Sequence, residues 1–170
     1  SLHKSMRSLE IEIYGFESRV RSQESGVEII EKLRIPNWER LWYVGDALRV
    51  GMTVDEIFEL SKIDRLFLNN IKEIVEFEEE IRSQKPALEG FNQGSEVRSQ
   101  KQEKNLTSEL LRQAKEMGFS DRRIAQLTNM TEKEIRELRN KAEIKPVYKT
   151  VDTCGAEFEA FTPYLYSTYE

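Results

Sequence analysis

The residue types that most often carry chemistry are scarce in this chain. Among its 170 residues, His3 is the one histidine and Cys154 the one cysteine. A single imidazole cannot build a histidine-rich zinc site, and a Ser–His–Asp arrangement would rest on a residue near a frayed end. We therefore expect His3 to be a solvated terminal residue and Cys154 to be a packed thiol without a catalytic role.

Carboxylates gather in one place, at Glu76, Glu78, Glu79 and Glu80. Successive residues of a helix point about 100° apart, so these groups cannot converge on one proton or one metal ion. The cluster predicts a solvated helix face. The sequence also has no glycine-rich phosphate loop and no CxxC pair. We predict no catalytic residue, no bound cofactor and no metal site in these residues.

Composition narrows the class of protein further. The chain has 26 basic and 31 acidic residues, a formal net charge of −5, and 38% hydrophobic residues. A net negative charge argues against a protein whose main function is to bind nucleic acid or an anionic membrane. The longest apolar run, residues 41–44, is far too short to span a bilayer, and one cysteine excludes a disulfide-stapled secreted scaffold. We expect a soluble, helical, cytoplasmic protein without an apolar leader.

Helical periodicity and capping signals organise the first part of the chain. They predict a segment over 24–33, a helix opening at Pro36–Asn37 and ending at Gly51, a helix beginning at the Thr53-x-x-Glu56 capping box, and a helix over 64–82. Asp64 is the expected N-cap of the last helix. The residues expected to face the core are Val27, Ile30, Leu33, Trp38, Leu41, Trp42, Leu48, Phe67, Ile71, Ile74 and Ile81.

The second part of the chain follows a polar stretch at 83–105, which we interpret as a flexible linker or an insertion. Three short helices are predicted over 106–142, with Gly118 ending the first, Ser120 capping the second and Thr131-x-x-Glu134 opening the third. Residues 146–151 are rich in strand-forming types, and 163–170 read as irregular. The fold class is all-α: a lobe over 1–82, a three-helix lobe over 106–142 and an extended arm over 143–170.

Two features leave alternatives open. Residues 120–142 are similar to a helix-turn-helix, so a nucleic-acid-binding module is the second hypothesis. The charges argue against it, because three glutamates on the would-be recognition helix nearly cancel its four cations. The tail is dense in aromatic residues, which either dock on another surface or fold back over the helices of this chain. These residues are Phe158, Phe161, Tyr164, Tyr166 and Tyr169.

The run Pro146-Val-Tyr-Lys-Thr-Val-Asp-Thr-Cys154-Gly-Ala-Glu-Phe158, followed by Tyr166-Ser-Thr-Tyr-Glu170, closely resembles one family. It is similar to the oligomerisation domain of the carbamoyl-phosphate synthase large chain. Residues 41–51, 63–68 and 115–121 resemble the corresponding helices. Gly155 stands where the family usually has alanine, and 83–105 is longer than expected.

The resemblance implies a non-catalytic, all-helical connecting and oligomerisation domain of an ATP-dependent ligase of arginine or pyrimidine biosynthesis. The parent would make carbamoyl phosphate from bicarbonate, ATP and glutamine-derived ammonia, with Mg or Mn. The implied partners are its two ATP-grasp halves, other copies of the chain and a glutamine amidotransferase small chain, with no nucleic acid and no membrane. We expect inter-lobe or inter-domain anchors in the C-terminal arm, and these are Tyr148, Asp152, Cys154, Glu157, Phe158, Tyr166 and Tyr169.

Overall fold

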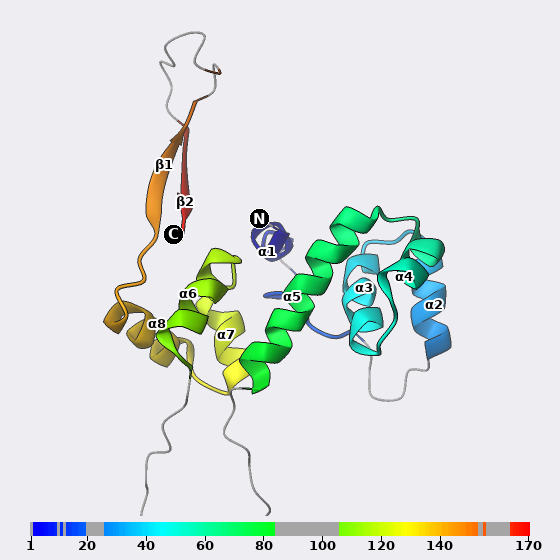
Figure 1. The fold of residues 1–170 in the computed structure, drawn as a ribbon, viewed down its shortest axis with the longest axis horizontal. Coiled ribbons are helices and arrows are strands. Elements are labelled where there is room, and N and C mark those ends of the chain that lie inside the picture. The colour runs from blue at the N-terminus through cyan, green and yellow to red at the C-terminus, as the bar shows by residue number, and fades with distance from the viewer. Residues whose placement is uncertain are drawn as a thin grey trace, which may run out of the picture. The chain divides into compact units, whose positions relative to one another are not determined.

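Helices dominate the described part of the molecule. The computed structural model describes residues 2–9, 11, 13–19, 26–83, 106–152, 155 and 164–170. Within them it has eight α-helices and one two-stranded sheet, and the chain divides into two compact units, Ser1–Lys85 and Pro86–Glu170 (Figure 1). The mostly helical class predicted from sequence is confirmed. Apart from Ser83, the predicted linker lies outside the described residues.

The first unit is built around α3. Its helices are α1 (Leu2–Arg7), α2 (Gly26–Arg34), α3 (Arg40–Arg49), α4 (Val54–Ser61) and α5 (Arg65–Ser83). Helix α3 packs against α2, α4 and α5, because its buried side chains cover most of its circumference. The largest fully buried side chains of its core are Phe16, Ile29, Leu33, Trp42, Ile57 and Leu68.

The starts and stops of these helices follow the sequence signals. The Thr53 hydroxyl accepts from the Glu56 amide at 3.2 Å, and the Glu56 carboxylate accepts from the Thr53 amide at 2.7 Å, so the predicted capping box is present. The Asp64 carboxylate accepts from the Leu66 amide at 2.8 Å at the start of α5. Gly51 follows α3 with φ of 90°, a conformation that glycine adopts without strain.

The predicted inward faces were wrong at three positions. Val27 is 71% exposed, Trp38 64% and Phe67 61%. Helix α2 buries the predicted Leu33, but its other buried residue is Ile29, four positions earlier, and not Val27. Trp38 lies before α3 begins at Arg40, so it is not part of the buried face of that helix. Spacings of three and four both fit a helical stripe, so the sequence pattern located the helices but not the edge of each buried face.

The expectation of a solvated His3 was also wrong. The His3 side chain is 1% exposed on α1, and its ring meets that of Phe16 edge-on with centroids 6.3 Å apart. Phe16 in turn lies against α3, where a Cβ on Gly45 would come within 3.0 Å of its Cδ1 atom. The indole nitrogen of Trp42 donates to the Gly15 carbonyl oxygen at 3.1 Å. The segment 13–19 therefore closes one side of the core and buries the histidine.

The second unit combines three short helices with a hairpin. The helices are α6 (Ser108–Glu116), α7 (Asp121–Thr128) and α8 (Glu132–Lys141), and α8 contacts both others. As predicted, Ser120 caps α7 and the Thr131 capping box opens α8. The core residues of this unit are Leu111, Ala114, Phe119, Ile124, Leu127, Ile135 and Ile144.

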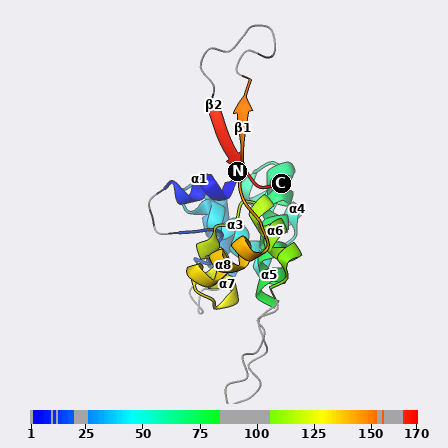
Figure 2. The same ribbon diagram turned by 90° about the vertical axis from the view of Figure 1, so that its left-hand side faces the viewer.

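The C-terminal arm forms an antiparallel hairpin. Strand β1 (Val147–Val151) pairs with β2 (Tyr164–Thr168), and both views show the two strands side by side (Figure 2). The extended prediction for 146–151 is confirmed. The irregular prediction for 163–170 was wrong, because a strand's pairing with a distant segment is not encoded in its own local pattern.

Candidate functional site

The hairpin is the most exposed regular element of the second unit. All five residues of β1 are exposed, and so are the first four of β2. An isolated two-stranded hairpin is marginally stable in water unless one of its faces is covered. This hairpin thus presents apolar surface that the described residues of the chain leave open.

The strand register sorts the hairpin side chains onto two faces. Val147 lies opposite Thr168, Lys149 opposite Tyr166, and Val151 opposite Tyr164. Directly opposed residues of an antiparallel pair share a face. We call this face the valine–tyrosine face. It has four large apolar side chains, Val147, Val151, Tyr164 and Tyr166, with Lys149 in its middle and Thr168 at one end.

The opposite face has fewer large apolar side chains but no charged one. Tyr148 lies opposite Ser167, and Thr150 opposite Leu165. Tyr148 and Leu165 are both exposed. These two large apolar side chains alternate with two hydroxyl groups, so this face is uncharged.

A charged cluster fixes the base of the hairpin to the helices. Asp121, at the start of α7, pairs with the Lys115 amine at 2.7 Å and with the Arg139 guanidinium at 3.2 Å. The ring of Tyr169, just after β2, lies 5.0 Å from the Lys115 Nζ atom and 6.0 Å from the Arg139 Cζ atom. Such cation–π contacts join the end of β2 to α6 and α8. We call Lys115, Asp121, Arg139 and Tyr169 the Tyr169 clasp.

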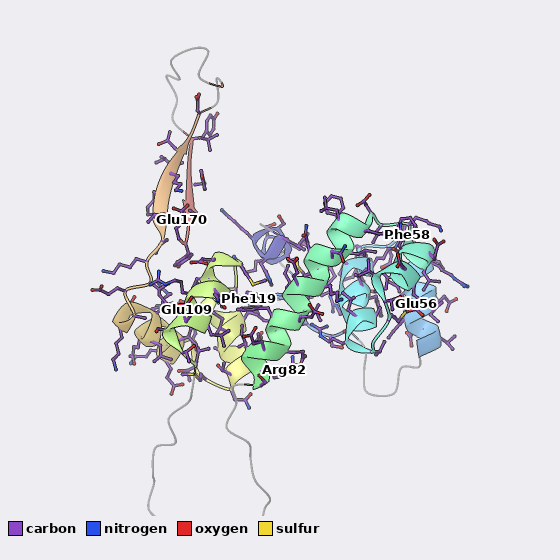
Figure 3. The ribbon with its side chains drawn as sticks, viewed as in Figure 1. Glu56, Phe58, Arg82, Glu109, Phe119 and Glu170 are labelled. Carbon is purple, nitrogen blue, oxygen red and sulfur yellow. The ribbon has the colours of Figure 1, made fainter. Side chains whose placement is uncertain are left out.

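Backbone carbonyls complete the clasp. Lys115 donates to the carbonyl oxygen of Phe119, which Figure 3 marks, at 2.8 Å, and Arg139 donates to the Ile144 carbonyl oxygen at 3.1 Å. The three charged side chains are only 7%, 12% and 14% exposed in the order Lys115, Asp121, Arg139. Their ion pairs are therefore little screened by solvent and hold a defined geometry.

Two pKa shifts describe the charge state of the hairpin. Burial raises the pKa of Tyr169 above its usual value of 10.0, with the Arg139 charge acting in the opposite direction. Its ring is therefore a neutral phenol at neutral pH. The Glu170 carboxylate, marked in Figure 3, accepts a hydrogen bond from Lys149, and this raises the pKa of that amine. Lys149, the cation on the valine–tyrosine side, is therefore paired.

The first unit contains a second ionic cluster, which is largely buried. Arg49 pairs with Asp46 at 3.0 Å and with Glu78 at 2.8 Å, and it also donates to the Phe16 carbonyl oxygen. The Asp46 carboxylate accepts from the Arg19 amide at 2.8 Å. Glu78 is 0% exposed, so its prediction as part of a solvated face was wrong, whereas the other three glutamates of that cluster are exposed or partly exposed.

A shallow groove of about 380 Å³ lies between α3, α4 and α5. Leu48, Met52 and Val54 contribute apolar surface to it. Lys72 and Glu76, which also line it, form an ion pair at 3.7 Å. The groove therefore has an apolar lining, and the two charged residues Lys72 and Glu76 neutralise each other.

The structure describes four of the seven expected anchor residues and does not test their role. Tyr148 and Tyr166 lie on opposite faces of the hairpin, Asp152 follows β1 and is exposed, and Tyr169 is in the clasp. Cys154, Glu157 and Phe158 lie outside the described residues, as does Phe161. The inter-lobe or inter-domain role of all seven expected anchors, which do not include Phe161, stays a prediction.

Sequence reasoning missed the charged members of the clasp. Lys115 follows Leu111 by four residues, so it occupies the buried stripe of α6, and this spacing was an available signal. Asp121 stands directly after the Ser120 cap and has the position of an ordinary first-turn acid. Arg139 has the spacing of an exposed cation of α8, yet its side chain is 14% exposed and faces Asp121.

Three other findings bear on function. In the part of the chain that the structure describes, no three or more His, Cys, Asp or Glu side chains gather as metal ligands would. None of the described helices is long and apolar enough to cross a membrane. On α8, Arg136 pairs with Glu132 at 3.0 Å and Lys133 with Glu137 at 3.9 Å, and all four side chains are exposed.

An exposed hairpin with valine and tyrosine side chains, clasped to three helices, is typical of domains that contact other protein surfaces. Residues 1–143 match the family described as the carbamoyl-phosphate synthetase large chain, oligomerisation domain. The chain belongs to this family, and the resemblance seen in the sequence is confirmed. Nothing in the match favours the nucleic-acid-binding alternative.

Relatives extend the similarity through the hairpin. The large chain of Archaeoglobus fulgidus is 44% identical over 171 residues, and that of Vibrio vulnificus is 43% identical over 172 residues. The N-terminal section of the large chain of Aquifex aeolicus is 46% identical over 170 residues. Each match covers 100% of this chain but only 15%, 14% and 27%, respectively, of the relative.

Proposed function

We propose that this chain is the connecting and self-associating domain of a carbamoyl-phosphate synthase large chain. In this role it fixes the relative position of two ATP-dependent halves and offers a surface to other copies of the large chain. The observation that supports this most directly is the family match over residues 1–143. The chemistry belongs to the parent, which joins bicarbonate and glutamine-derived ammonia at the expense of ATP with Mg or Mn.

The paired charges of the domain are consistent with a structural task. Arg49 and Asp121 each bridge two opposite charges from different elements, which stiffens the unit that contains them. A stiff connector suits a reaction whose carbamate intermediate is labile in water, because transfer between halves then stays enclosed. We place the parent in the cytoplasm, in arginine or pyrimidine biosynthesis, with a glutamine amidotransferase small chain as partner.

Sedimentation of the 170-residue chain across a concentration series tests self-association. We expect the weight-average mass to rise above 20.0 kDa as the concentration increases. A mass that stays at 20.0 kDa up to about 100 μM would exclude self-association through this domain with a Kd below about 100 μM.

Coupling in the full-length large chain tests the connecting role. We expect Tyr169→Leu to lower carbamoyl phosphate formed per ATP hydrolysed, while bicarbonate-dependent ATP hydrolysis stays near the parent rate, because the clasp fixes geometry and touches no reacting atom. The matched control is Tyr164→Leu, an exposed tyrosine at the other end of β2 that is not among the expected anchors. A parallel fall of ATP hydrolysis and product would contradict a purely connecting role.

A further inference from the structure

One face of α3 holds a segment that has no regular secondary structure. Trp42, Asp46 and Arg49 follow one another at spacings of four and three, so they share one face of this helix. Each of these side chains binds one backbone group of residues 13–19, which form neither helix nor strand and which we call the strap. Buried backbone groups require hydrogen-bond partners, and the strap obtains them from α3. The groups bound are the Gly15 carbonyl, the Arg19 amide and the Phe16 carbonyl, respectively.

The strap also holds α1 on the rest of the first unit. Among the described elements, α1 has no extended packing contact with another helix. Its buried His3 instead meets the ring of Phe16 edge-on, and Met6 contributes to the same core cluster. The placement of α1 therefore depends on the placement of the strap.

Arg49 is the member of this face that also reaches α5. Its guanidinium pairs with Asp46 at 3.0 Å and with the α5 residue Glu78 at 2.8 Å, in addition to the strap carbonyl. A guanidinium has several N–H donors in a rigid plane, so it can bind three acceptors in a defined geometry. Both carboxylates are buried, so solvent weakens these contacts little. Arg49 therefore fixes the strap, α3 and α5 relative to one another.

We propose that Arg49 is a positioning residue, which couples the placement of α1 to that of α5. This inference rests on the proposed function, because a connector must transmit position between the parts of the chain that it joins. In such a connector, α1 adjoins whatever precedes this chain, and α5 leads on along the chain toward the second unit. A displacement of α1 reaches α5 through the strap while Arg49 binds both. Without Arg49, the strap and α1 can shift while α5 stays in place.

The Arg49→Lys variant separates positioning from charge. It keeps a cation beside the two buried carboxylates, so the charge balance of the core is retained. A lysine ammonium on its flexible stem cannot hold both carboxylates and the strap carbonyl in one plane, however. The matched control is Arg82→Lys, because Arg82 forms only an exposed pair with Glu79 on α5.

The indole N–H of Trp42 reports the strap directly, because it donates to the Gly15 carbonyl oxygen. Its hydrogen exchange is followed by NMR in the 170-residue chain, with the 64% exposed Trp38 as the internal reference. We expect Arg49→Lys to speed exchange of the Trp42 indole by about tenfold or more, and Arg82→Lys by less than about twofold. Unchanged exchange in Arg49→Lys would overturn the proposal, because a cation of any shape would then hold the strap. Equal acceleration of the α4 amides would also overturn it, since the change would then be a general loss of stability.

A change on α5 tests whether position is transmitted. Glu78→Gln removes the charge that ties Arg49 to α5 and leaves the strap and the residues of α3 unsubstituted. We expect the amides of α1 and the strap to exchange at least about fivefold faster in this variant, relative to those of α4. Glu79→Gln, at the neighbouring exposed position, should leave them unchanged. Equal exchange of the α1 amides in both variants would exclude coupling between α1 and α5.

The full-length large chain tests whether the coupling is used. Arg49→Lys should lower carbamoyl phosphate formed per ATP hydrolysed by about twofold or more, and Arg82→Lys should not. A loosened strap with an unchanged ratio, while Tyr169→Leu lowers that ratio, would overturn positioning by Arg49 and leave the connecting role intact. An unchanged ratio in both Arg49→Lys and Tyr169→Leu would refute the connecting role and with it the use of the coupling. The exchange measurements on the 170-residue chain judge the coupling itself in either case.

Discussion

The two units contain ionic clusters of opposite design. In the first unit one cation, Arg49, lies between two carboxylates, Asp46 and Glu78. In the second unit one carboxylate, Asp121, lies between two cations, Lys115 and Arg139. The first cluster joins α3, α5 and the segment 13–19 inside a helical core, whereas the second joins three helices and then carries the ring of Tyr169.

The difference teaches how one kind of interaction serves two tasks. The carboxylates around Arg49 are 3% and 0% exposed, so that cluster stabilises the core. The cations around Asp121 are also largely buried, and an aromatic ring lies near both of them. A cation can contact a carboxylate and an aromatic face at once, so a pair of cations can attach a surface element that a pair of carboxylates could not.

Removing the central cation of the first cluster should have the largest effect. We expect Arg49→Met to lower the free energy of unfolding by about 3–5 kcal/mol, because both carboxylates stay buried after their shared cation is lost. Urea unfolding followed by tryptophan fluorescence reports on this unit, since Trp38 and Trp42 are the two tryptophans of the chain.

Arg82→Met is the matched control for that variant. Arg82 pairs with Glu79 at 2.7 Å, but the two side chains are 42% and 51% exposed, so we expect a loss below about 1 kcal/mol. Equal losses for Arg49→Met and Arg82→Met would show that burial of the first cluster contributes nothing beyond a surface pair.

Removing the central charge of the second cluster should cost somewhat less. We expect Asp121→Asn to destabilise α6–α8 by about 2–3 kcal/mol, because two partly buried cations then face each other without the carboxylate between them. Native-state hydrogen exchange of the α6–α8 amides measures this change.

The same variant also tests whether the clasp fixes the hairpin. We expect amide protection to fall in β2 together with α6–α8, since Tyr169 contacts the same two cations. Glu132→Gln, which removes an exposed pair with Arg136, should change stability by less than about 0.5 kcal/mol. Loss of helix protection without any change in β2 would show that the hairpin is held elsewhere.

Local signals made the helices predictable from sequence. The capping boxes at Thr53 and Thr131 and the caps at Ser120 and Asp64 are all evident in the residue pattern, because a capping residue bonds to amides only two or three positions away. Such contacts depend on spacing along the chain, which the sequence states directly.

Long-range partners were not predictable in the same way. Glu78 has the local pattern of a solvated glutamate, and its burial depends on Arg49, which lies 29 positions earlier. Arg139 has the local pattern of a surface cation, yet it pairs with Asp121, which lies 18 positions earlier. His3 is close to the terminus but buried, because segment 13–19 returns Phe16 to its ring. In each case the deciding contact joins elements whose approach only tertiary packing determines.

The two capping boxes should lose the same amount of stability when their threonine is replaced, although they lie in different units. Each satisfies its helix start with a threonine hydroxyl and a glutamate carboxylate, and the distance from amide to hydroxyl is 3.2 Å in both. We expect Thr53→Ala and Thr131→Ala each to cost about 1 kcal/mol in unfolding free energy. Serine at either position is the control and should retain most of the stability. A clear inequality would mean that local capping is coupled to the different cores beneath the helices.

The smallest expected effect is the pH dependence of the first capping box. Hydrogen bonds from the backbone and the hydroxyl of Thr53 hold the pKa of Glu56 below its ordinary value of 4.5. A carboxyl group whose pKa is lower in the folded state stabilises that state above its ordinary pKa, and this contribution is lost as the pH falls through the lowered value. The Glu56→Gln variant should therefore be less stable than the parent at about pH 6, and the difference should shrink toward about pH 3.

Repeating that comparison in the Thr53→Ala background isolates the capping box from the general charge of α4. Figure 3 marks Glu56 and Phe58 on this helix. Without the hydroxyl of Thr53, the pH-dependent loss of stability caused by Glu56→Gln should be reduced, because one of the two hydrogen bonds that lower the pKa is gone. The backbone bond at 2.7 Å remains, so a smaller difference should persist. A difference that grows toward acid pH would mean that folding raises the pKa of Glu56, which would contradict stabilisation of its carboxylate by the capping box.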